Sequence, residues 1–151
     1  MRRGTTYSVV SEPNPPEAII RSVRSTRWVE VADLFWSDEW ARDLYSYATP
    51  DEIHKPVPDG IYADTDNKFA LRFVTVLSDK ITKKTYEPFR EQYGAGYLVL
   101  NVQYPFFNAR TVYTMKRHWS ASGTHGDRGC FRDIYIAFSS LNVRKFQRWN
   151  A

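Results

Sequence analysis

The chain has one cysteine and no long apolar run, and each shortage excludes a class of protein. Cys130 is the single cysteine among 151 residues, so no disulfide can form within the chain. No apolar stretch approaches the roughly 20 residues that a transmembrane helix needs. We therefore expect an intracellular protein, located in the cytoplasm, or in an organelle matrix if residues 1–11, which contain two arginines and no acid, are a targeting remnant.

The sequence also lacks the short motifs that mark many catalytic and cofactor sites. It contains no phosphate-binding P-loop and no dinucleotide fingerprint, and its histidines and cysteine match no zinc-site spacing. "DGIY" at 59–62 is similar to the opening of a GIY-YIG nuclease motif, but no second half follows at a suitable spacing. We therefore expect no metal and no cofactor, and a protein that binds rather than catalyses.

Acidic residues are scarce in the last third of the chain. Residues 104–151 carry 8 Lys and Arg against 2 Asp and Glu, a balance of +6, whereas the balance of residues 1–103 is −2. A region polarised in this way can present a cationic face to RNA or another polyanion. The candidate contacts are Arg110, Lys116, Arg117, Arg128, Arg132, Arg144, Lys145 and Arg148.

Aromatic residues, in contrast, are abundant. They make up 16% of a chain that is 42% apolar and 25% charged, which is a globular composition. A core of ordinary make-up does not need so many aromatic rings, so some are expected to line a pocket, an interface or a stacking surface. We expect a single domain over 1–151, with residues 1–13 as a flexible N-terminal arm.

Capping and turn signals predict the early elements. Asn14 and the prolines after it predict a helix over about 16–25. Ser37, followed by two acids, predicts the start of a second helix. "TPDE" at 49–52 has the form of a capping box, and "PDG" at 58–60 has the form of a turn.

Apolar periodicity predicts the later elements. The alternation of Phe69, Leu71 and Phe73 predicts a strand over 69–77. Residues 78–94 are expected to be partly helical, with an interruption at Pro88 and an end at Gly94. Further strands are expected at about 97–104, 110–119 and 132–140, followed by a short helix or another strand over 142–150. These elements predict an α+β fold, with an antiparallel sheet of about four to six strands and helices mainly N-terminal.

The Gly-rich segment 120–132 brings possible catalytic groups close together in sequence. A ribonuclease or other small phosphodiesterase needs a base, an acid and a cation around the reacting phosphate. His118, His125 and Lys116 are the candidates for these roles. The alternative is a polar hairpin loop in which the glycines satisfy turn geometry.

Four segments of the second half together resemble the middle of a START-type lipid-transfer domain. They are "KKTYE" (83–87), "YLVLNVQYPF" (97–106), "NARTVYTMKR" (108–117) and "DIYIAFSS" (133–140). The resemblance covers about residues 79–140 and implies a helix-grip fold in which Pro105 and Arg110 form a β-corner. It also implies a cup for an apolar small molecule or lipid or, if the cup is degenerate, an interaction subunit. The candidate lining residues are Tyr97, Val99, Phe106, Tyr113 and Tyr135, for each of which core packing is the alternative.

Three hypotheses therefore remain. The first is a START-like binding module without catalysis. The second is a basic subunit that docks on RNA or another polyanion, or on partner proteins, through residues 110–148. The third is a phosphodiesterase that uses the two histidines.

Overall fold

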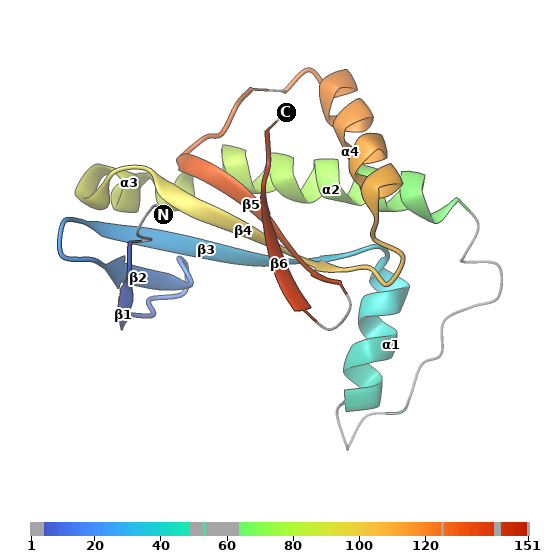
Figure 1. Ribbon diagram of the computed structural model, residues 1–151, viewed down its shortest axis with the longest axis horizontal. Helices are drawn as coiled ribbons and strands as arrows, with labels where there is room; N and C mark the ends of the chain where they lie inside the picture. Colours follow the sequence, from blue (N-terminus) through green and yellow to red (C-terminus); the bar gives the residue numbers. More distant parts are fainter. Residues whose placement is uncertain (1–4, 49–52, 54–63, 125, 141–142, 151) are drawn as a thin grey trace. The chain divides into compact units, whose positions relative to one another are not determined.

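The strands lie side by side in one open mixed sheet in the order β1-β2-β3-β4-β5-β6 (Figure 1). The computed structural model describes residues 5–48, 53, 64–124, 126–140 and 143–150. Neighbouring strands are antiparallel in the pairs β1/β2, β2/β3 and β5/β6, and parallel in β4/β5. The bounds are β1 Ser8–Ser11, β2 Ala18–Arg21, β3 Thr26–Phe35, β4 Gly96–Gln103, β5 Phe131–Ser140 and β6 Val143–Arg148.

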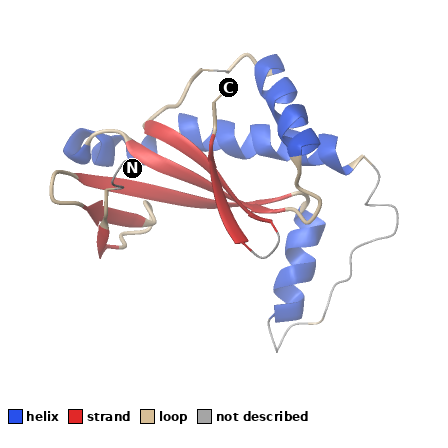
Figure 2. Ribbon diagram, in the orientation of Figure 1, coloured by secondary structure: helices blue, strands red, loops and turns tan. Residues whose placement is uncertain are grey.

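The helices lie between β3 and β4 and between β4 and β5 along the chain (Figure 2). Between β3 and β4 the chain forms α1 (Asp38–Ala48), α2 (Thr65–Thr82), a 3-10 turn η1 (Lys84–Tyr86) and α3 (Glu87–Tyr93). A further helix, α4 (Ala109–Ala121), connects the parallel strands β4 and β5. None of the helices described is both long enough and apolar enough to cross a membrane. These elements confirm the predicted α+β class.

The described residues form two compact units. Unit 1 consists of residues within 1–32, 79–101 and 126–150. Unit 2 consists of residues within 33–78 and 102–125. Unit 1 therefore holds β1, β2, most of β3 and β4, α3, β5 and β6, whereas unit 2 holds α1, most of α2, and α4.

Several predicted elements are confirmed. The side chain of Ser37 accepts a hydrogen bond from the amide of Trp40 (3.0 Å) at the start of α1. Pro88 lies in the first turn of α3, and Gly94 ends that helix with a φ of 76°. The strands predicted at 97–104 and 132–140 are β4 and β5, and of the two alternatives for the last residues, the strand is correct. The motifs predicted at 49–52 and 58–60 lie outside the described residues.

The helix predicted over 16–25 is wrong, because a tight turn reverses the chain inside that range. Ala18–Arg21 is the strand β2, which pairs with β3. The amide of Ser22 donates to the carbonyl of Ser25 (2.8 Å), and the Ser22 hydroxyl accepts from the amide of Ser25 (3.1 Å). This hairpin places the apolar Ile19 and Ile20 in a sheet.

The strand predicted over 69–77 is also wrong, because the residues that become buried are four apart rather than two apart. Phe69, Phe73 and Leu77 are fully buried on α2, whereas Leu71, which the alternation placed beside them, is 57% exposed. A spacing of four residues follows one face of a helix. The alternation of apolar residues in this segment is therefore coincidental.

The strand predicted over 110–119 is the helix α4, so the β-corner at Pro105 and Arg110 does not form. Asn108 caps α4: its side-chain oxygen accepts from the amides of Arg110 (2.8 Å) and Thr111 (3.4 Å). In return, the Thr111 hydroxyl accepts from the Asn108 amide (3.2 Å), which completes a capping box. Because α4 crosses between β4 and β5, these strands are parallel, and the prediction of a wholly antiparallel sheet is wrong at this pair. The prediction of mainly N-terminal helices is likewise wrong for α4.

Trp28 on β3 is the centre of the core of unit 1. Its ring lies 5.5 Å from that of Tyr86 and 5.2 Å from that of Phe131, and its indole N–H donates to the carbonyl of Gly94 (2.8 Å). A Cβ at Gly96 would come within 2.3 Å of the indole, so this strand position accepts only glycine. Unit 1 therefore packs η1, α3 and β5 around one tryptophan.

Candidate functional site

The sheet in unit 1 has one closed side and one open side. Successive residues of a strand point to opposite sides. On β4, Leu98 and Leu100 are fully buried, whereas Tyr97 and Val99 are half-buried. On β3, Trp28 and Glu30 lie on the closed side with η1, and Val29 lies on the other. We call the side that carries Val29, Tyr97 and Val99 the open face.

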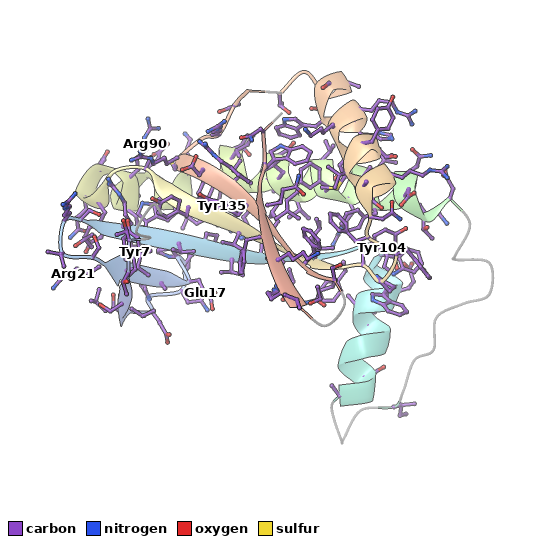
Figure 3. The ribbon with its side chains drawn as sticks, in the orientation of Figure 1. Tyr7, Glu17, Arg21, Arg90, Tyr104 and Tyr135 are labelled. Carbon is purple, nitrogen blue, oxygen red and sulfur yellow. The ribbon has the colours of Figure 1, made fainter. Side chains whose placement is uncertain are left out.

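The open face carries a shallow cavity of about 370 Å³ that is wide open to solvent. Its walls are apolar and aromatic and come from β2, β3, β4, β5, β6 and the segment before β1. Figure 3 labels two of the lining residues, Tyr7 and Tyr135. The full lining is Tyr7, Ile20, Val29, Tyr97, Val99, Tyr135 and Phe146.

Three tyrosines give this cavity its aromatic character. The rings of Tyr97 and Tyr135, on the neighbouring strands β4 and β5, have centroids 6.3 Å apart. The hydroxyl of Tyr97 is hydrogen-bonded to Tyr7. Burial raises the pKa of Tyr97, the neighbouring Tyr7 raises it further, and Arg132 and Arg27 act in the opposite direction. The phenol of Tyr97 therefore stays neutral at physiological pH and lies within the field of two arginines.

A group of arginines surrounds Asp133, which is the residue opposite Tyr97 in the β4/β5 register. The Asp133 carboxylate lies 3.7 Å from the Arg128 guanidinium and 3.9 Å from that of Arg132, and it accepts a hydrogen bond from Arg148. Asp133 is buried, whereas the side chains of Arg132 and Arg148 are 60% and 52% exposed. We call Arg128, Arg132 and Arg148 the arginine cluster; one buried carboxylate leaves it with an excess of positive charge.

The other basic residues of β6 divide between the two sides of the sheet. Arg144 lies opposite Ser139 and donates to the side chain of Asn101, which follows Val99 by two residues on β4, so Arg144 extends the open face. Lys145 pairs with Phe138 and points to the opposite side. Of the predicted polyanion contacts in unit 1, Lys145 is therefore the one that does not belong to the open face.

The remaining predicted binding residues lie in unit 2, so they do not line the cavity. Phe106 is exposed in the turn after β4, with its ring 5.8 Å from that of Tyr104, and Tyr113 is exposed on α4. Arg110, Lys116 and Arg117 also lie on α4. Arg110 is 3.7 Å from Asp66, and Arg117 donates to the Asn67 side chain (3.2 Å).

Two of the three predicted phosphodiesterase residues, Lys116 and His118, lie on α4. His118 Nε2 lies 3.0 Å from the side-chain oxygen of Asn67 on α2. Lys116 is two residues earlier on the same helix and therefore points in a very different direction, since each residue turns the helix by about 100°. His125 lies outside the described residues. Among the described residues, His118 is therefore hydrogen-bonded to the Asn67 amide and is not paired with Lys116.

A buried ionic group on the closed side of unit 1 was not found from the sequence. The Lys80 ammonium donates to Glu30 (2.5 Å), and the Tyr86 hydroxyl donates to the same carboxylate oxygen (2.9 Å). Burial, and next the hydrogen bond to Glu30, raise the pKa of Tyr86. The one available signal was Glu30 itself, an acid at a position of the "WVEV" strand that faces the core. Since Lys80, Tyr86 and Glu30 are all bonded to one another, we interpret this group as structural.

The sequence also missed four lining residues of the cavity, namely Tyr7, Ile20, Val29 and Phe146. Tyr7, Ile20 and Phe146 belong to segments that were expected as an arm, a helix and an undecided element, and no element was predicted around Val29. No pattern therefore connected these residues with β4 and β5. Among the described residues, no group of three or more His, Cys, Asp or Glu side chains could hold a metal ion.

No family model, no curated protein and no solved structure matches the chain.

Proposed function

We propose that the chain is a binding module, without catalysis of its own, that holds an apolar or aromatic ligand on the open face of unit 1. The observation that carries this proposal is the cavity of about 370 Å³, which side chains from six segments of the chain line with aromatic and aliphatic groups. Mostly apolar concave sites with a few polar groups are typical of small-ligand binding.

Six of the seven lining residues have a definable role in such a site. Val29 and Val99 form an aliphatic floor, because they lie on the central strands β3 and β4. Tyr97, Tyr135 and Phe146 supply ring faces and edges for stacking. The hydroxyls of Tyr7 and Tyr97 supply polar contacts that would fix the orientation of a ligand. Three of these residues, Tyr97, Val99 and Tyr135, are also lining candidates on the sequence.

The ligand class that the START resemblance implies, an apolar small molecule or lipid, is compatible with this lining. The proposal uses the resemblance for the ligand class alone, because residues 110–119 form α4 instead of the strand that the resemblance implies.

A charged substitution in the floor tests the proposal. Val99→Asp places a carboxylate in the cavity, and Val31→Asp makes the same change on the same side of β3 outside the lining. The probe is 1-anilinonaphthalene-8-sulfonate, an apolar aromatic anion whose fluorescence rises on binding. We expect saturable binding by the unmodified protein and by Val31→Asp, and at least a tenfold weaker affinity for Val99→Asp.

Circular dichroism of all three proteins must show the same fold, so that the probe reports on the cavity and not on unfolding. Equal probe binding by the three proteins would contradict the proposal, because the cavity would then not be the site. Native mass spectrometry of the protein from its own source adds the identity of any molecule retained.

A further inference from the structure

The arginines beside the cavity need an explanation that an apolar ligand does not give. Arg128, Arg132 and Arg148 surround one carboxylate, and Arg27 acts on the same tyrosine hydroxyl as Arg132. Arginines with more than half of their side-chain surface exposed, such as Arg132 and Arg148, can still accept an anion. The open face thus joins aromatic rings to unneutralised positive charge.

We infer that the ligand of the open face is single-stranded nucleic acid, with bases stacked on Tyr97, Tyr135 and Phe146 and phosphates bound by the arginine cluster. This inference rests on the proposed function, because it uses the same face and names the ligand class.

The rings are arranged as a stacking surface rather than as core. Tyr97 and Tyr135 are half-buried with centroids 6.3 Å apart, and Phe146 on β6 is 65% exposed although it lines the same cavity. Exposed rings on a sheet surface bind unpaired bases of any sequence, because every base has a π-face. In a duplex the bases already stack on one another, so such rings favour a single strand over a double strand.

The cations lie where a strand crossing these rings would carry its phosphates. Asp133, the centre of the arginine cluster, is opposite Tyr97 on β4 and two residues before Tyr135 on β5. Arg148 is the residue opposite Tyr135 on β6, and Arg144 lies four residues away on the same side of that strand. Positive charge therefore flanks the rings along β6, and it complements a phosphate backbone that passes over Tyr135 and Phe146.

A fluorescein-labelled 12-nucleotide oligothymidylate tests the inference by fluorescence anisotropy, with a labelled duplex of equal length beside it. We expect the single strand to bind more tightly than the duplex and to displace anilinonaphthalene sulfonate from the cavity. Tyr135→Leu should weaken single-strand binding by roughly tenfold, because it removes one stacking ring. Tyr113→Leu, which changes an exposed tyrosine of unit 2, should leave the affinity unchanged.

The salt dependence tests the phosphate contact separately. Loss of one contact should reduce the slope of log K against log salt by about 0.7 for a single strand. We expect this change for Arg132→Gln, and no change for Arg90→Gln, because Arg90 lies on α3, the helix whose Phe89 contacts Trp28 on the closed side (Figure 3).

Two results would overturn the inference. One is equal binding of single strand and duplex with no effect of Tyr135→Leu, which would indicate charge attraction without stacking. The other is absence of oligonucleotide binding while Val99→Asp still abolishes binding of the apolar probe. In the second case the proposed function is retained with another ligand, such as a lipid found at one per chain. If Val99→Asp does not change binding of the apolar probe, both the proposed function and this inference are rejected.

Discussion

The two units contain similar residues but use them differently. In unit 1, tyrosines and arginines lie side by side on an open face, where their ring faces and charges remain accessible. In unit 2, aromatic rings are packed into a core: the ring of Phe69 stacks on that of Tyr104 at 4.8 Å, and that of Phe73 meets Trp119 at 6.2 Å. The aromatic surplus of the sequence therefore serves two purposes, and composition alone does not separate them.

Polar groups follow the same division. In unit 2 the carboxylate of Asp66 accepts from the Tyr104 hydroxyl (3.1 Å) and from the Thr111 hydroxyl (2.8 Å), and Arg110 lies 3.7 Å away. These bonds connect α2 to the end of β4 and to α4, so the polar groups of unit 2 hold its own elements together. In unit 1 the arginine cluster outnumbers its carboxylate. The excess charge of the arginine cluster in unit 1, beside the bonded pairs of Asp66 in unit 2, supports the proposal that unit 1 holds the ligand.

The largest expected effect is on the core that supports the open face from behind. Trp28→Ala should lower the free energy of unfolding by about 3–5 kcal/mol, because it removes a fully buried indole and its hydrogen bond to Gly94. Chemical denaturation measures the change. Trp28→Phe keeps a ring against Tyr86 and Phe131 and should cost clearly less; an equal cost for both variants would show that the ring contacts do not stabilise unit 1.

The polar cluster of unit 2 should be the next most sensitive site. Asp66→Ala should destabilise the protein by about 2–3 kcal/mol, because two part-buried hydroxyls lose a charged acceptor. Asp66→Asn keeps one carbonyl oxygen and should cost less. If Asp66→Ala left the denaturation midpoint unchanged, the contrast between satisfied pairs in unit 2 and excess charge in unit 1 would lose its basis.

Alkaline pH should act on the closed side of unit 1 through Tyr86. Burial and the bond to Glu30 raise the pKa of Tyr86 above its usual value of 10.0, so the folded state keeps a proton that the unfolded state loses. The stabilisation from this tyrosine is therefore complete below pH 10 and is lost as the pH rises above it, by at most about 1.4 kcal/mol per pH unit.

Tyr86→Phe removes the titrating hydroxyl and should make the decline above pH 10 shallower. Stability measured by urea denaturation between pH 8 and pH 11 gives the slope for both proteins. Identical slopes would mean that Tyr86 does not contribute. Tyr97 and Tyr104, whose pKa values are also raised by burial, would then be the sources of the decline.

The cap of α4 should have a smaller effect. Asn108→Ala removes the oxygen that accepts from the amides of Arg110 and Thr111 and should cost about 1 kcal/mol. Asn108→Asp retains an acceptor at the same place and should recover most of the loss. A variant Asn108→Ala as stable as the unmodified protein would show that the start of α4 is held by packing of Thr111 and Met115 alone.

The smallest effect on stability, with a large effect on binding, is expected at Phe146. Because its ring is 65% exposed on an edge strand, Phe146→Ala should change the free energy of unfolding by less than about 1 kcal/mol. Binding of the oligonucleotide should nevertheless weaken several-fold. Val143→Ala on the same strand, outside the cavity lining, should change neither quantity. If Phe146→Ala lowered the free energy of unfolding as much as Trp28→Ala, Phe146 would be part of the hydrophobic core and not of an open binding surface.

Local signals in the sequence predicted the elements whose ends carry strong turn or capping residues. Each of these signals is compatible with a single secondary structure: Ser37 before α1, Pro88 and Gly94 around α3, and the apolar runs of β4 and β5. The segments of α2 and α4 do not. "FALRFVTVL" alternates as a strand does, and the buried Phe69, Phe73 and Leu77 also fit a helix, so tertiary packing decides between the two.

The candidate site was predictable only on the strands that were predicted. Tyr97, Val99 and Tyr135 lie on the predicted strands β4 and β5 and line the cavity. Tyr7 and Ile20 were missed, because their place in the site depends on the β1/β2 and β2/β3 pairings, which long-range contacts establish. The strands predicted at 97–104 and 132–140 are β4 and β5, whereas the strand predicted at 110–119 is the helix α4.

The exposed strand β6 has a further consequence for how this chain behaves in a crowded solution. It ends the strand order, and each of its residues is exposed, so its outer backbone groups could pair with a strand of another molecule. Arg144, Lys145 and Arg148 oppose such pairing, because two copies would bring like charges together. The arginines proposed to contact phosphate would then also prevent aggregation at this edge, and a variant that neutralised them would lose its ligand and its colloidal stability together.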